Sequence, residues 1–220
     1  MTTEGKTLEN LISSAKNIAV MPSRMSSIDN YSASVGLYHM VKDVADGKNV
    51  YFVYPDKIPS LCENLLKKEE ILKNVSNREL QVSIDYSNSK AAAVHWYTKD
   101  DVLHLKLSPI ERDFDLHNVT TLVQGYSFDL VITLGVQHLS ELGFVYTELE
   151  EEIKSAQIVN IDNTSLNSQF GHVNVVDTLA DTVSLLVLKK SVEWGLSVGT
   201  KAAAALLTGI SHKESTALSI

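Results

Sequence analysis

The sequence predicts an α/β protein with a mainly parallel sheet flanked by helices and an inserted antiparallel β-hairpin region. Strand-like apolar runs and helical stretches alternate up to residue 72, as is typical of a parallel α/β layer. In the second half, the continuous apolar runs "DLVITLG" and "QIVNID" indicate strands buried on both faces. Between the two halves lie β-rich segments bounded by turn residues, which favour an antiparallel insertion.

Composition narrows the class of protein. With 220 residues, 44% hydrophobic and 21% charged, the chain suits one globular domain over residues 1–220 and excludes disordered or fibrous proteins. The net charge of -8 repels phosphate backbones and disfavours nucleic acid as a partner.

Cys62 is the only cysteine, so an intrachain disulfide is excluded and a reducing compartment is expected. The N-terminus "MTTEGKTLEN" lacks a signal-peptide pattern and the longest apolar run, "AAAALL", is too short for a membrane span, so we expect a cytoplasmic protein that does not enter a membrane.

The first elements are predicted by helical spacing and by capping residues. Residues 7–16 are predicted to form a short helix with Thr7 as its N-cap, followed by the strand "NIAVM". After the Pro- and Ser-rich loop "PSRMSSID", a helix is predicted from Asp29 to Asp46, ended by Gly47.

The next strand, "NVYFVYP", precedes a predicted helix and then the β-rich region. Ser60 and Glu63 have the spacing of a capping box, which predicts a helix through Leu72. The runs "LQVSIDY", "AAVHWYT" and "VLHLKLS" follow, and "KDD" between the last two suits a hairpin turn. We therefore expect a β-rich elaboration over residues 78–110, within the single domain.

The remaining helices are predicted around the two apolar strands. An acidic helical stretch, "YTELEEEIKSA", separates "DLVITLG" from "QIVNID". Asp177 or Thr178 is predicted to cap a long helix that ends near Gly195. Thr200 is predicted to cap a shorter helix, "KAAAALLTG".

Ligands of parallel sheets bind beyond the carboxyl ends of the strands. Three loops follow such ends, namely "PSRMSSID", the segment Gly135 to His138, and the segment Asp162 to Thr164. The first opens a helix, so its backbone N–H groups, helped by Arg24, are a candidate phosphate contact.

This succession of loops resembles the DHH family of phosphoesterases. In that family one strand leads to a His and an Asp-x-Asp loop, a second ends in Asp, and a third ends in Asp-His-His. The segment "IVNIDNTSLNSQFGHVNVVDTLADTVSLL" is similar to the third motif and its sequel, and the resemblance extends through "TKAAAALLTGI"; the matching positions include Asn167, Phe170, Gly171, Val176, Asp177 and Thr178. A smaller substrate-binding domain usually follows the family's core, whereas this chain ends at Ile220, so we expect no C-terminal substrate domain.

The resemblance also shows which metal-binding positions are substituted. The family's ligand positions fall here on Met21, on Ser27 to Asp29, on Gly135, and on Asp162 to Thr164, and Ser211, His212 and Lys213 follow "TGI". Of the expected ligands, the carboxylates of Asp29 and Asp162 remain. A pair of divalent ions needs several carboxylates and imidazoles. We therefore expect no bound metal, no catalytic residue and no two-metal hydrolysis.

The leading hypothesis is a pseudoenzyme of the DHH family that acts as a non-catalytic binding or scaffolding module. Its expected partner is another protein or a second copy of itself, or else a nucleotide held in the old cleft. The candidate ligand contacts are Arg24, Ser27, Asp29, Asp162, Asn163 and His172. Asp29 and Asp162 also have a structural interpretation, because Asp commonly caps helices and loops.

The alternative hypothesis is a phosphodiesterase or phosphatase that depends on Mn or Mg and acts on short oligonucleotides or cyclic dinucleotides. It requires an atypical ligand set in which Asp29 and Asp162 are completed by His138 or His172. A third hypothesis is one half of an active heteromer, in which a partner chain supplies the missing groups.

Overall fold

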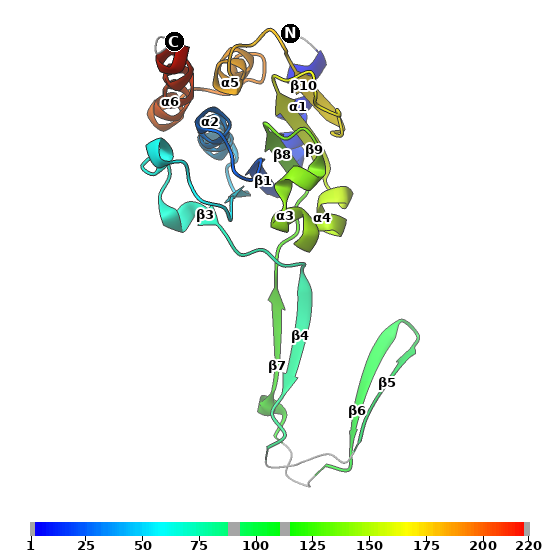
Figure 1. Cartoon of the computed structure of the whole chain (residues 1–220). Helices are drawn as coiled ribbons and strands as arrows, with labels where there is room; N and C mark the ends of the chain where they lie inside the picture. Colours follow the sequence, from blue (N-terminus) through cyan, green and yellow to red (C-terminus); the bar gives the residue numbers. More distant parts are fainter. Residues whose placement is uncertain (1–2, 88–92, 111–114, 218–220) are drawn as a thin grey trace. The chain divides into compact units, whose positions relative to one another are not determined.

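The computed structural model describes residues 3–87, 93–110 and 115–217 (Figure 1). The chain divides into two compact units. The core unit comprises Met1–Asn77 and Tyr126–Ile220, and the hairpin unit comprises Arg78–Gly125. The hairpin unit thus includes the predicted 78–110 elaboration and continues to Gly125.

The core unit is built on a six-stranded sheet in which all paired strands run parallel. This sheet confirms the predicted fold class. The strand order is β10 (Val173–Val176), β9 (Gln157–Asp162), β8 (Leu130–Leu134), β1 (Asn17–Pro22), β2 (Asn49–Val53) and β3 (Ile71–Leu72). All five residues of β8 are buried, as its continuous apolar sequence predicts for a central parallel strand.

Helices cover both faces of this sheet (Figure 1). Alternate residues of β1 point to opposite faces, so Ile18 belongs to one apolar cluster and Ala19 to the other. The cluster around Ile18 includes buried residues of α1 (Thr3–Ser14), α2 (Ile28–Val44), α5 (Val183–Ser191) and α6 (Thr200–Ala217). The cluster around Ala19 includes buried residues of α3 (Phe144–Glu148) and α4 (Glu150–Ser155). In the part of the chain that the structure describes, no helix has the length and apolar character to cross a membrane.

Helix α2 follows β1 and has the boundaries that its capping residues dictate. Ser27 is the N-cap, and its hydroxyl accepts a hydrogen bond from the Asn30 N–H at 3.1 Å. Just past the helix, Gly47 has a φ of +69°, a conformation that glycine adopts without strain. The predicted helix from Asp29 to Asp46 is therefore confirmed to within two residues at each end.

The predicted helix from Ser60 to Leu72 is wrong. The segment forms two short 3₁₀ turns, η1 (Ser60–Cys62) and η2 (Lys68–Glu70), followed by β3. The reason is long-range pairing, because Ile71 lies beside Phe52 at the edge of the sheet and the Leu72 carbonyl accepts from the Tyr54 N–H. These sheet hydrogen bonds replace those of a helix.

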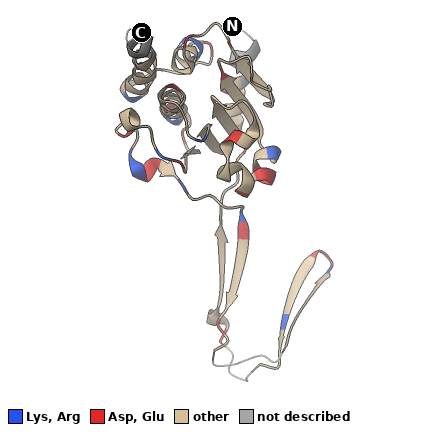
Figure 2. Ribbon diagram, in the orientation of Figure 1, with Lys and Arg blue, Asp and Glu red and all other residues tan. Residues whose placement is uncertain are grey.

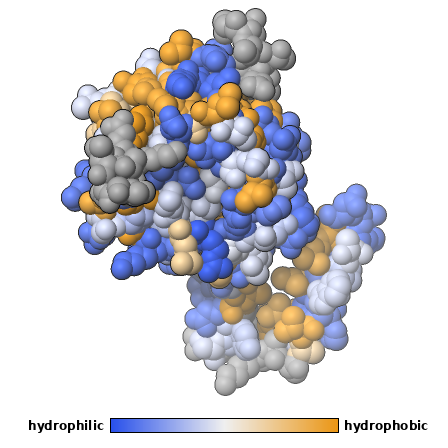
Figure 3. All heavy atoms as spheres, turned by 45° about the horizontal axis from the view of Figure 1, so that its top comes forward, coloured by the Kyte–Doolittle hydropathy of each residue, from blue (hydrophilic) through white to orange (hydrophobic). Residues whose placement is uncertain are grey.

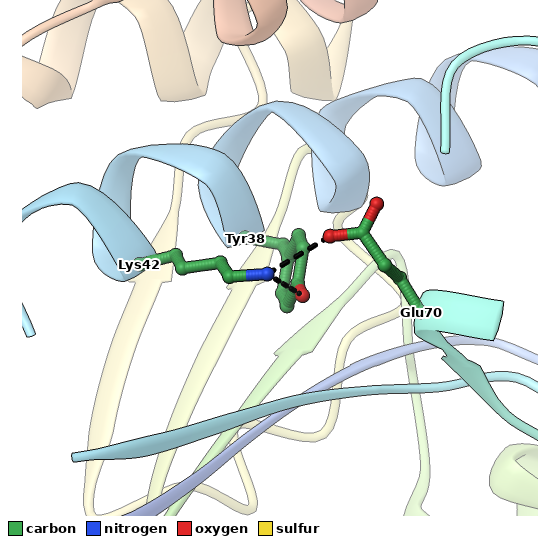
Figure 4. Close-up of polar contacts among 3 residues, drawn as sticks. All are labelled: Tyr38, Lys42 and Glu70. Atoms are coloured by element: carbon green, nitrogen blue, oxygen red, sulfur yellow. Dashed lines mark hydrogen bonds and ion pairs between the residues drawn. The ribbon is translucent and has the colours of Figure 1, made fainter. Parts of the chain in front are cut away.

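An ion pair fixes this segment to α2. The Lys42 ammonium donates to the Glu70 carboxylate at 2.8 Å and to the Tyr38 hydroxyl at 3.0 Å (Figure 4). The pKa of Lys42 is raised by these two hydrogen bonds, and the Lys42 contact lowers the pKa of Glu70.

Three helix boundaries also differ from the prediction. Helix α1 begins at Thr3, so Thr7 lies inside it and is not its N-cap. Helix α5 begins at Val183 with Thr182 as N-cap and ends at Ser191. The predicted caps, Asp177 and Thr178, instead follow the unpredicted strand β10. Asp177 belongs to a turn, since its carboxylate accepts from the Leu179 N–H at 3.0 Å.

The other helices agree in place but differ in extent. The acidic stretch forms two helices, α3 and α4, rather than one. Helix α6 contains Thr200, its predicted cap, as its first residue and runs past the predicted end at Gly209 to Ala217. Two further 3₁₀ turns complete the described elements, η3 (Leu116–Asn118) in the hairpin unit and η4 (Leu139–Leu142) after β8.

The hairpin unit consists of two antiparallel ribbons. Strand β5 (Ala93–Lys99) pairs with β6 (Val102–Ser108), and β4 (Glu79–Ile84) pairs with β7 (Val119–Gln124). At the predicted "KDD" turn, Asp100 and Asp101 have φ values of 50° and 61°, typical of the tight turns that match strand twist. The antiparallel insertion is confirmed, whereas β7 was not predicted.

Candidate functional site

The three loops predicted from the sequence lie at one edge of the sheet. Strands β1, β8 and β9 are neighbours, and near their carboxyl ends Pro22 pairs with Leu134, which in turn pairs with Ile161. Because the strands are parallel and in register, the segments that follow them emerge at the same edge. This edge is the candidate functional site.

Asp29, in the first turn of α2, binds the start of another helix. Its two carboxylate oxygens accept hydrogen bonds from the backbone N–H groups of Val183 at 2.7 Å and Ser184 at 2.9 Å. The Ser184 hydroxyl donates to the Asp29 carbonyl at 3.3 Å. Backbone N–H groups in the first turn of a helix lack partners within that helix and favour negative charge. Asp29 therefore caps α5 with both of its oxygens.

Glycine on α6 allows this contact to be close. A Cβ at Gly209 would lie 2.1 Å from the Ser184 hydroxyl and 2.9 Å from an Asp29 carboxylate oxygen. Any larger side chain would therefore separate α6 from the junction of α2 and α5.

Asp162, at the end of β9, is 3% exposed. One carboxylate oxygen accepts from the Asn163 N–H and the other from the Asn167 side-chain amide, both at 2.8 Å. Burial raises the pKa of Asp162, hydrogen bonds from Asn167 and Asn163 oppose that rise, and the negative charge of Glu141 adds to it. The carboxylate is thus held by two donors in a poorly solvated position.

A chain of buried polar side chains connects Asp162 with β8. The Asn167 amide also donates to the Val136 carbonyl at 2.8 Å, and its oxygen accepts from the Asn160 amide at 2.8 Å. The Asn160 oxygen accepts from the Thr133 hydroxyl at 3.0 Å. Buried polar groups that lack such partners would be strongly destabilising, so this network fixes the loop after β9 to the sheet.

Gly135 follows β8 at the position where the resembled motif has an aspartate. Its φ is +62°, and an ideal Cβ on it would lie 2.0 Å from the Asn30 side-chain nitrogen. The Gly135 N–H donates to the Ile161 carbonyl at 2.9 Å. The space for a side chain at this position is therefore filled by Asn30 from α2.

The other candidate contacts have separate roles at this edge. Asn163 donates its side-chain amide to the Ala180 carbonyl at 3.0 Å. The aliphatic part of Arg24 lies against Gly143, where an added Cβ would be 2.8 Å from the Arg24 Cδ. His138 is exposed and precedes η4.

The structure does not bring His172 together with Asp162. The His172 Nδ1 atom accepts a hydrogen bond from the Ile158 N–H at 3.0 Å, which places the imidazole near the amino end of β9. Asp162 lies at the carboxyl end of the same strand, about 13 Å away at the usual rise per residue.

A cavity of about 430 Å³ opens at the junction of α2, α5 and α6. Its lining residues are Ser26, Ser27, Ile28, Asp29, Pro59, Thr182, Gly209 and His212. Of the predicted ligand contacts, Ser27 and Asp29 line this cavity. Thr182 was missed because it was not recognised as the cap of α5, and its hydroxyl accepts from the Leu185 N–H at 3.0 Å.

The family resemblance implies a pair of Mn or Mg ions at this edge, and the side chains present do not fit such a pair. Asp29 and Asp162 each hold hydrogen-bond donors on both oxygens, and Gly135 has no side chain. Among the described residues, no group of three or more His, Cys, Asp and Glu side chains is arranged to hold a metal. A site for two metal ions needs several carboxylate and imidazole ligands. The two carboxylates present here already accept hydrogen bonds on both of their oxygens.

Comparison with known proteins concerns the fold. No protein-family model and no curated protein matches the sequence. Among solved structures, the chain is similar to an exopolyphosphatase-related protein from Bacteroides fragilis, with a TM-score of 0.65 and 13% identity, over 97% of this chain and 52% of that chain. This chain therefore spans about half the length of that protein. The likeness shows that the two proteins share an α/β fold.

Proposed function

We propose that the chain is a protein of phosphoesterase-like fold that performs no two-metal hydrolysis and acts as a non-catalytic binding or scaffolding module. The observation that carries this proposal is the role of Asp29, whose two oxygens cap α5. Asp162 supports it in the same way through its bonds to Asn163 and Asn167.

The chemical argument concerns charge. Two-metal hydrolysis requires ions that lower the pKa of a bound water and hold the phosphoryl oxygens. Two divalent cations a few Å apart repel each other strongly unless several anionic ligands lie between them. The groups that donate hydrogen bonds to the Asp162 carboxylate come from Asn163 and Asn167, and both are neutral amides. Neutral amides cannot offset the positive charge of a cation, so the site lacks the negative charge that would hold two metal ions.

The proposed partner is a protein rather than a nucleotide. Asp29 lines the cavity at the α2–α5 junction, and its negative charge opposes the binding of phosphate there. The net charge of -8 adds to this repulsion. Exposed apolar side chains, by contrast, occur on both ribbons of the hairpin unit and suit a protein interface.

Hydrolysis assays test this proposal. Short oligonucleotides and cyclic dinucleotides are incubated with the protein and Mn²⁺, with Asp162→Ala as the matched variant. We expect no turnover above the buffer rate for either protein. Turnover that disappears in Asp162→Ala would overturn the proposal and favour the metal-dependent phosphodiesterase. Turnover that appears only after mixing with a partner chain would favour the heteromer.

Thermal unfolding tests the choice of partner. A ligand that binds the folded state raises the melting temperature. We expect no concentration-dependent rise with nucleotides or with Mn²⁺ or Mg²⁺. A saturable rise with a nucleotide would show that the cleft, and not a protein interface, is the binding site.

A further inference from the structure

The ribbon formed by β4 and β7 has one apolar face. Side chains directly opposite each other in an antiparallel pair point to the same face. The register of this ribbon therefore places six side chains on one face: Leu80, Val82, Ile84, Val119, Thr121 and Val123. Leu80 is 65% exposed and Val123 is 56% exposed. The apolar face is thus open to solvent at the end formed by Leu80 and Val123, whereas Ile84 and Val119 at the other end line a cavity.

The ribbon formed by β5 and β6 repeats this pattern. One face carries Val94, Trp96, Thr98, Leu103, Leu105 and Leu107. Trp96 is 73% exposed. The other face is more polar, and there the Tyr97 and His104 rings stack at 4.7 Å. Apolar side chains are visible on the surface of the hairpin unit in Figure 3.

The apolar face of the β4–β7 ribbon is a candidate contact surface. Four of its side chains, Leu80, Val82, Val119 and Val123, are between 38% and 65% exposed. The largest apolar patch of a typical monomer measures about 300–600 Å² and often has a function. A two-stranded ribbon alone is also only marginally stable in water.

The outer edge of β7 is suited to strand pairing. Its sequence, "VTTLVQ", contains neither a charged residue nor proline (Figure 2). Natural edge strands usually carry such residues to prevent pairing with another chain. Strand β4, on the other side of the ribbon, contains Glu79. The edge of β7 is therefore the better candidate for an intermolecular sheet.

We propose that β7 pairs antiparallel with β7 of a second copy of this chain, around a two-fold axis at Thr121. In this register Val119 lies opposite Val123 of the second copy and Thr121 lies opposite itself. The apolar faces of the two β4–β7 ribbons, one from each copy, then lie on the same side of one four-stranded sheet. A shift of one residue would place the apolar face of one copy beside the polar face of the other, so the hydrophobic pattern of the strands specifies the register.

Charge and symmetry favour a second copy over an unrelated protein. The hairpin unit has five basic and seven acidic residues, a net charge of -2 out of the chain's -8. Contact through this unit therefore keeps most of the negative charge away from the interface. A two-fold interface also matches apolar to apolar automatically, because both sides present the same surface. This inference names the partner in the proposed scaffolding role and rests on that role.

Cysteine cross-linking tests the register. In a Cys62→Ser background, Thr121→Cys would place two thiols opposite each other at the axis, within the Cα separation that a disulfide spans. Ser83→Cys on β4 is the matched control, since β4 lies on the far side of the ribbon from the axis. We expect oxidation to give a covalent dimer with Thr121→Cys and none with Ser83→Cys. Equal cross-linking of both variants, or of neither, would overturn the proposed pairing.

A charge variant tests the association without cysteines. Thr121→Lys places two ammonium groups opposite each other at the axis, whereas Ser83→Lys adds the same charge away from it. We expect light scattering to show a dimer for the natural protein and Ser83→Lys, and at least a tenfold weaker dimer for Thr121→Lys. A natural protein that stays monomeric at high concentration would overturn the inference, even if an unrelated protein bound the ribbon. A monomer without hydrolytic activity would leave the proposed function standing, whereas a dimer that hydrolyses phosphodiesters would sink the proposed function alone.

Discussion

The Asn30 side chain occupies the space into which any side chain at residue 135 would project. An ideal Cβ on Gly135 would lie 2.0 Å from the Asn30 nitrogen, closer than real Cβ contacts. Gly135 directly follows the central strand β8, and Asn30 belongs to the helix that also carries Asp29. At the position where the resembled motif has a carboxylate, this chain therefore has no side chain, and Asn30 fills the space that one would need.

Substitution of Gly135 should reveal this packing. Gly135→Ala is expected to lower the free energy of unfolding by about 3 kcal/mol, because backbone strain at positive φ and a steric clash add. Gly47 is a matched control, with a φ of +69° and nothing within 4 Å of an added Cβ. Gly47→Ala should cost about 1–2 kcal/mol from backbone strain alone. Equal losses in urea titrations would show that Asn30 does not fill the space.

Removal of the Asp29 carboxylate should loosen the start of α5. Asp29→Ala is expected to cost about 2–3 kcal/mol, because the Val183 and Ser184 N–H groups lose a charged acceptor. Ser27→Ala, which removes the cap of α2, should cost about 1 kcal/mol. Hydrogen exchange measures the effect directly. Faster exchange at Val183 and Ser184 is expected in Asp29→Ala only, and unchanged rates there would refute the capping role.

Asn167→Asp should make stability depend strongly on pH. The variant places a second carboxyl beside Asp162, whose pKa is already raised by burial, and like charges raise both pKa values further. A carboxyl with a raised folded pKa stabilises the fold below its unfolded pKa, and this stability is lost as pH rises through the folded pKa. The variant should therefore lose about 1 kcal/mol in acid, because a protonated carboxyl donates one hydrogen bond where the Asn167 amide donates two. At pH 7 it should be several kcal/mol less stable than the natural protein.

Thr133→Val is the control for this network. It removes the hydrogen bond to Asn160 without adding a charge, so a loss of about 1 kcal/mol is expected at both pH values. Urea titrations at pH 4 and pH 7 distinguish the two variants. An Asn167→Asp protein with the same loss at both pH values would contradict the buried position of Asp162.

Protonation of His39 should lower the stability of the fold in mild acid. The imidazole is buried, and among the described residues its Nε2 atom has no hydrogen-bond partner. Burial lowers the pKa of His39 below 6.5, opposed by a hydrogen bond with Leu65 and by the charge of Glu70. Because the folded pKa is depressed, the stability contributed by neutral His39 is present above pH 6.5 and is lost as pH falls through the folded value.

The measurement for His39 is the free energy of unfolding between pH 7.5 and pH 5. The natural protein should lose up to about 1.4 kcal/mol per pH unit below pH 6.5, and His39→Gln should remove this slope. His138→Gln, at an exposed position, should retain it. A slope that persists in His39→Gln would assign the acid sensitivity to another group.

The sequence predicts elements whose signals are local. The apolar runs of β8 and β9 identify buried strands, and Ser27 with Gly47 delimits α2. The segment from Ser60 to Leu72 was misassigned because its capping box is a local signal, whereas the pairing of Ile71 with Phe52 is long-range. Strand β10 has four residues, too few for a clear period.

The candidate site follows the same division. The sequence places Asp29 at a helix start and Asp162 at a strand end, and both positions are correct. The sequence does not reveal the hydrogen-bond partners of these carboxylates, because Asp29 accepts from the Val183 N–H, 154 residues away. The cavity is likewise assembled from α2, α5 and α6, so Thr182 and Ser27 meet only in the folded chain.

The most direct test of the central claim is anomalous diffraction from a crystal of this protein soaked in Mn²⁺. Catalytic metal pairs in phosphoesterases lie about 3.5–4 Å apart. Because Asp29 and Asp162 are held by backbone and amide donors, we expect no pair of manganese peaks at the carboxyl edge of the sheet. Two peaks at that spacing, coordinated by these carboxylates, would contradict the account.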